Sequence, residues 1–110
     1  MYLDFSVGEQ TYKLRLATRN IVALEKVIGK NPLSIFGNGD EIPSVTTMAT
    51  ILWASLQQYQ HGISLDDAYD MFDKYLEEHT ATDFISVILD IYKASGLIRN
   101  DKGTEEEKNV

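Results

Sequence analysis

Residues 18–36, TRNIVALEKVIGKNPLSIF, constrain the fold most, because this stretch specifies a helix, its end and the turn that follows. Thr18 is a suitable N-cap, and Gly29 is a typical helix stop. A proline disfavours the helical conformation in the residue before it, so Asn31-Pro32 directs the chain out of the helix, and residues 33–36 are predicted to form one short turn. The apolar residues with helical spacing are Ile21, Leu24, Val27 and Ile28.

Two short segments with alternating apolar residues precede this stretch. In residues 2–7 and 12–16 the alternation places one set of side chains on a single strand face: Leu3, Phe5, Val7, Tyr12, Leu14 and Leu16. Gly8-Glu9-Gln10 lies between the segments, so the pattern predicts an antiparallel hairpin with one buried face. A lone hairpin is marginal in water, and it must therefore pack on helices or extend another sheet.

Three more helices are predicted after the loop signal Gly37-Asn38-Gly39-Asp40. The expected starts and stops are, in chain order, Ser44 to Gly62, a second helix capped by Ser64, and a third from Thr80 or Thr82 to Gly96. The buried stripes of the first two are predicted at Val45, Met48, Leu52, Leu56 and Tyr59, and at Leu65, Tyr69, Phe72 and Leu76. The third has only a narrow polar stripe, so we expect it to be central in the core or covered by a partner.

These elements predict an α+β fold, predominantly α, with an N-terminal β-hairpin followed by a compact bundle of about four helices. Residues 1–98 are predicted to form a single globular domain, in which residues 1–17 are the hairpin and residues 18–98 are helical. Residues 99–110 have no apolar periodicity and are predicted to be a disordered acidic tail. If Leu24 is buried, its replacement by Ala is expected to be strongly destabilising.

The net charge of −7 is unevenly distributed. Residues 1–60 contain five Lys or Arg and five Asp or Glu, whereas residues 61–98 contain two against eight. A surface of that sign repels phosphate groups, so nucleic acid and membrane are not expected partners. Cysteine is absent, no apolar run could span a membrane, and the N-terminus does not resemble a secretory signal.

Catalytic and metal-binding patterns are not found above background. Asp66, Asp70, Asp73 and Glu77 share one helix face, where they would bind a cation or serve as acid and base, or else form the solvated side of an amphipathic helix. The second interpretation is favoured, because amphipathicity alone demands this pattern. His61 and His79 lie at helix ends and are better explained by the helix dipole than by catalysis. The sequence therefore predicts a protein that is not an enzyme and has no cofactor or metal.

Aromatic residues are numerous for so small a core. Tyr and Trp are favoured at interface centres because they are large and keep a polar tip, although burial in the core is the simpler explanation for most of them. Two fall off the main helical stripes, Trp53 and Tyr75. The candidate partner-binding residues are Trp53, Tyr59, Tyr75 and Tyr92.

The segment TYKLRLATRNIVALEKVIGKNPLSIF, followed by a helical remainder, resembles the tail assembly chaperones of long-tailed bacteriophages. The resemblance is strongest to the small forms from phages and prophages of Gram-positive bacteria. Its elements are a strand ending in Leu-Arg-Leu, a helix containing Ala23-Leu24-Glu25, and the turn at residues 29–32. The acidic amphipathic helix in GISLDDAYDMFDKYL is similar in style.

This resemblance implies a non-enzymatic chaperone that binds the tape-measure protein, keeps it soluble and helps to recruit tail-tube subunits. Such a protein acts in the cytoplasm of the bacterial host, is absent from the mature virion, and in many phages also exists as a longer frameshifted form. A homo-oligomer is possible. The alternatives are a tail-completion or connector protein that stays in the virion, and a metal protein or enzyme that uses the acidic helix.

Overall fold

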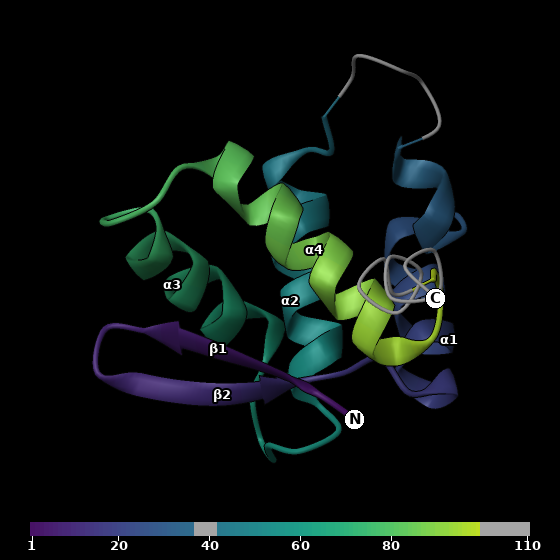
Figure 1. Ribbon diagram of the computed structural model, residues 1–110, viewed down its shortest axis with the longest axis horizontal. Helices are drawn as coiled ribbons and strands as arrows, with labels where there is room; N and C mark the ends of the chain where they lie inside the picture. Colours follow the sequence, from purple (N-terminus) through teal and green to yellow (C-terminus); the bar gives the residue numbers. More distant parts are fainter. Residues whose placement is uncertain (37–41, 100–110) are drawn as a thin grey trace, which may run out of the picture.

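The computed structural model describes residues 1–36 and 42–99, and within them the predicted α+β fold is confirmed: a two-stranded hairpin is followed by four α-helices (Figure 1). The predicted loop at residues 37–40 and nearly all of the predicted tail lie outside the described residues. The elements are β1 (Leu3–Val7), β2 (Gln10–Leu14), α1 (Thr18–Ile28), the 3-10 helix η1 (Pro32–Phe36), α2 (Val45–Leu56), α3 (Leu65–Tyr75) and α4 (Ala81–Ser95).

The hairpin pairs β1 with β2 in antiparallel register, with Phe5 opposite Tyr12 and Val7 opposite Gln10. Its two-residue turn has φ +61° at Gly8, as expected where glycine occupies the first turn position of a tight hairpin. Phe5 and Val7 are buried against the helices. The hairpin therefore packs on the bundle, one of the two arrangements expected from its sequence.

Helix α2 is the central helix of the molecule. It contacts α1, α3, α4 and β2, and Figure 1 shows it behind α4, with α3 and α1 on either side. Its buried residues surround almost the whole helix: Met48, Ala49, Thr50, Ile51, Leu52, Ala54, Ser55 and Leu56. Val45 and Tyr59, placed on the buried stripe by the sequence, are exposed. They lie at or beyond the helix ends, where neighbouring elements no longer cover them.

Helix α4 buries one face rather than lying at the centre. Phe84, Ile88, Ile91 and Tyr92 are buried, and the helix packs on α2 and β1. Its exposed residues include Ser86 and Asp90, on the opposite side. The apolar sequence of α4 predicted a central position for this helix. That position belongs to α2, which is also largely apolar and contacts α1, α3, α4 and β2.

Most predicted helix ends are confirmed. Ser64 and Thr80 each accept a hydrogen bond from the backbone N–H three residues on, at 3.0 Å. Gly29 adopts φ +73° at the end of α1, a left-handed conformation that glycine adopts without strain. Thr18 is not the N-cap of α1. That position belongs to Ala17, whose N–H donates to the Asn20 side chain at 3.0 Å.

Candidate protein-binding surfaces

Two of the four predicted partner-binding residues belong to the core. Tyr92 is 0% exposed and Tyr75 is 6% exposed, so neither ring is available to a partner in this structure. The Tyr92 hydroxyl donates to the backbone oxygen of Pro32 at 2.9 Å, which ties α4 to η1. Burial raises the pKa of Tyr92. In this structure both residues therefore have structural roles.

Tyr75 joins an aromatic cluster between the hairpin, α3 and α4. Its ring lies 5.5 Å from that of Phe5 and 5.4 Å from that of Phe84. His79 stacks on Tyr75 at 4.4 Å. Burial, and then the negative charge of Asp83, raise the pKa of Tyr75. The cluster fixes the hairpin to the helices, and it explains why Tyr75 is buried although it lies off the predicted stripe.

The buried stripe of α3 is rotated from the predicted one. Ala68, Phe72 and Tyr75 are buried, whereas Tyr69 is 40% exposed and Leu76 is also exposed. Both sets satisfy helical spacing, so periodicity alone does not separate them. The small Ala68 side chain allows α3 to pack closely on α2. Tyr75 is buried on the same side of α3 because its ring packs against Phe5 and Phe84. The rotation leaves Tyr69 and Leu76 on the surface.

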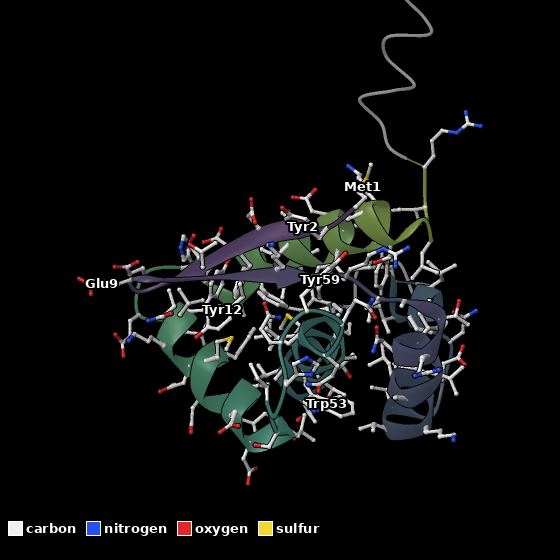
Figure 2. All side chains as sticks on the ribbon, turned by 90° about the horizontal axis from the view of Figure 1, so that it is seen from below. Met1, Tyr2, Glu9, Tyr12, Trp53 and Tyr59 are labelled. Carbon is white, nitrogen blue, oxygen red and sulfur yellow. The ribbon has the colours of Figure 1, made fainter. Side chains whose placement is uncertain are left out.

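Tyr59 lies in an aromatic patch at the open end of the hairpin, which we call the hairpin-end patch: Tyr2, Lys13, Tyr59 and Gln60. The rings of Tyr2 and Tyr59 meet edge to face at 5.4 Å (Figure 2). The Lys13 ammonium lies 4.8 Å from the centre of the Tyr2 ring. The Gln60 side chain accepts from the Lys13 N–H and donates to the Lys13 carbonyl, both at 2.9 Å. Tyr59 is nevertheless 40% exposed, so a well-anchored patch presents aromatic surface to solvent.

Trp53 is separate from this patch. Figure 2 shows Trp53 on the opposite side of α2 from the hairpin. Its side chain is half-buried and packs against the core. The four residues predicted from the sequence therefore do not form one site: two are core residues, and Tyr59 and Trp53 lie on different faces.

Helix α1 carries an outer face that the sequence did not single out. Leu24 is fully buried, but Val27, predicted on the same stripe, is exposed, as is Val22. Arg19 and Lys26 lie two turns apart on the side opposite Leu24. A surface hollow runs along this face and is lined, among the described residues, by Thr18, Arg19, Val22, Ala23 and Lys26.

The four acidic residues predicted on one face of α3 and its C-terminal extension are all exposed: Asp66, Asp70, Asp73 and Glu77. Among residues 1–36 and 42–99, no group of three or more His, Cys, Asp or Glu is arranged to hold a metal ion. Within the described part of the chain, Asp83 is the one carboxyl with a shifted pKa, and hydrogen bonds from the Thr80 backbone and side chain lower that pKa. Asp83 thus acts in helix capping. None of the helices described is long and apolar enough to cross a membrane.

The fold and these surfaces define a small α+β protein in which a hairpin packs on a helical bundle and exposed apolar side chains lie on several separate faces. The chain belongs to a family of unknown function, DUF6096, whose model matches residues 4–110. No curated protein and no solved structure matches the chain.

Proposed function

We propose that this protein is a bacteriophage tail assembly chaperone that binds the tape-measure protein and assists assembly of the tail tube. The sequence resemblance described above supports the proposal. The observation that carries it is the hairpin-end patch, where Tyr2 and Tyr59 are held in place by Lys13 and Gln60 yet stay exposed. A client-binding chaperone needs such apolar surface on a highly charged scaffold.

The composition of the patch suits a helical client with an apolar face. Tyrosine offers a large contact area with few rotatable bonds, and its hydroxyl tolerates water when no client is bound. Met1 precedes Tyr2 and is also exposed, and its flexible thioether side chain adapts to uneven surfaces. The net charge of −7 opposes non-specific self-association of the free protein.

The chaperone acts without catalysis, cofactor or metal, in the cytoplasm of the bacterial host, and does not remain in the finished particle. Mass spectrometry of purified virions tests this location. We expect the protein to be absent from purified virions. A stoichiometric copy in the virion would favour the other candidate, a tail-completion or connector protein.

Co-expression with a fragment of the tape-measure protein tests client binding directly. We expect the fragment to gain solubility and to co-purify with the wild-type chain. The double variant Tyr2→Ser/Tyr59→Ser should lose most of this gain. The control Ile42→Ser/Val45→Ser also removes two exposed apolar side chains, but away from the patch. This control should keep the full gain in solubility of the fragment. A fragment that stays insoluble with the wild-type chain would refute the proposal.

A further inference from the structure

Two exposed helix faces of this protein carry opposite charge. The outer face of α1 contains Arg19 and Lys26, and Lys30 follows the end of the helix. The outer face of α3 contains Asp66, Asp70 and Asp73, and Glu77 follows its end. In each helix the charged residues lie opposite the buried stripe, so they project away from the core. Within the described residues, none of these side chains has an ion-pair partner.

Both faces also carry apolar side chains beside the charges. Val22 and Val27 flank the basic residues of α1, and Tyr69 and Leu76 flank the acidic residues of α3. Charged side chains alone would be explained by solvation. Exposed valine, leucine and tyrosine in the same stripes give each face the mixed character of a protein interface.

The spacing of the charges matches between the two helices. Arg19 and Lys26 are seven residues apart, as are Asp66 and Asp73, and Asp70 and Glu77. Seven residues correspond to two helical turns, about 10.5 Å along the axis. Two helices laid antiparallel therefore bring both basic residues opposite acidic ones, and their dipoles also oppose each other favourably.

One molecule cannot join these faces itself. Both views show α1 and α3 on opposite sides of α2 (Figures 1 and 2). We propose that the outer face of α1 in one copy docks on the outer face of α3 in a second copy. This contact is heterologous, so a copy that uses its α1 face still has a free α3 face for the next copy. Repetition of the contact gives a closed ring or an open filament. The proposal does not depend on the chaperone function.

Light scattering coupled to size-exclusion chromatography tests this contact with the full chain. The wild-type mass should rise above the 12.4 kDa of one copy as protein concentration increases, and this increase should shrink at high salt. Arg19→Glu/Lys26→Glu and Asp66→Lys/Asp73→Lys should each abolish the increase. Mixing the two variants, or combining all four changes in one chain, should restore it.

Two controls keep the result specific. Asp4→Lys/Asp90→Lys changes the net charge as much as the α3 variant does, but on other elements, and should associate like the wild type. Circular dichroism should show unchanged helix content in every variant, because all the altered residues are exposed.

With the wild-type chain and the charge-reversal variants, any of four results would overturn the proposal. They are a wild-type chain that is monomeric at all concentrations in low salt, a mass that stops at a closed dimer, charge reversals without effect, and failure of the reversed pair to restore association. A further variant, Glu105→Gln/Glu106→Gln/Glu107→Gln, tests a different occupant of the α1 face. Loss of association in that variant would assign the face to the acidic C-terminal segment and also contradict docking on α3.

Discussion

Replacing Tyr92 by Phe isolates one buried hydrogen bond from the packing around it. The ring is 0% exposed and its hydroxyl donates to the Pro32 carbonyl at 2.9 Å, so the variant keeps the apolar ring and removes only the donor. The Pro32 carbonyl then loses the hydrogen bond from the Tyr92 hydroxyl. One such hydrogen bond contributes about 0.5–1.5 kcal/mol to stability, and we expect the free energy of unfolding to fall by that amount at pH 7.

The same variant changes how stability depends on pH. Burial raises the pKa of Tyr92 in the folded protein, whereas in the unfolded chain the phenol ionises near its usual value of about 10. The stabilising contribution of the neutral phenol is therefore complete below pH 10 and is lost as pH rises above it, by up to about 1.4 kcal/mol per pH unit. In Tyr92→Phe the loss of stability above pH 10 should therefore be smaller than in the wild type. A weaker loss should remain because the pKa of Tyr75 is also raised.

Urea unfolding followed by circular dichroism, at pH 7 and again above pH 10, measures both effects. Tyr69→Phe is the matched control, because Tyr69 is 40% exposed and water can solvate its hydroxyl. The control should not change the stability at pH 7. Equal behaviour of the two variants would show that the contact between Tyr92 and Pro32 contributes nothing to stability.

Three further predictions concern the fold. Leu24→Ala should lower the free energy of unfolding by about 2–5 kcal/mol in the same urea assay, because Leu24 is fully buried; an unchanged midpoint would contradict this packing. Gly8→Ala should cost about 1–3 kcal/mol, because φ at Gly8 is +61°; the nearby end of the flexible Lys74 side chain can move, so a neutral result would mean that the turn rearranges. Thr80→Ala should move the pKa of Asp83 upward in an NMR titration, because the Thr80 hydroxyl helps to lower it. The stability that this carboxylate contributes is present at neutral pH and lost as pH falls, and an unchanged Asp83 titration would refute the capping role.

Features that depend on neighbouring residues could be predicted from the sequence. The hairpin, the caps at Ser64 and Thr80, and the stop at Gly29 each rest on contacts within a few residues. Such contacts form in nearly the same way whatever the rest of the chain does. Two helix ends are placed wrongly: the N-cap of α1 is Ala17 and not Thr18, a difference of one residue, and α2 ends at Leu56, well before the predicted stop at Gly62.

Features decided by distant contacts could not be predicted. Tyr92 is a core residue, and its hydroxyl donates a hydrogen bond to a residue 60 positions away. No local sequence pattern predicts that contact. The sequence also did not determine which face of α3 is buried, because the stripes through Tyr69 and through Ala68 both have helical spacing. The hairpin-end patch combines Tyr2 with Tyr59, which become neighbours only after folding. Its sequence signal was limited to the surplus of aromatic residues.

The two proposed interfaces lie on different elements, and this separation predicts how they would act together. The hairpin-end patch uses Tyr2 and Tyr59, whereas self-association uses the outer faces of α1 and α3. Docking between copies therefore leaves each patch open, and an assembly presents several patches to one long client. Several linked weak contacts bind far more tightly than one, without any new contact.

A comparison of short and long clients tests this reasoning. Arg19→Glu/Lys26→Glu should bind a short tape-measure fragment with unchanged affinity, because the patch is intact. The same variant should bind a long client with at least tenfold lower apparent affinity, since it no longer joins several patches. Tyr2→Ser/Tyr59→Ser should show the reverse pattern, with normal self-association and weak binding of both clients. If Arg19→Glu/Lys26→Glu lost the same affinity for short and for long clients, α1 would contact the client directly. The outer face of α1 and the hairpin-end patch would then belong to a single client-binding surface.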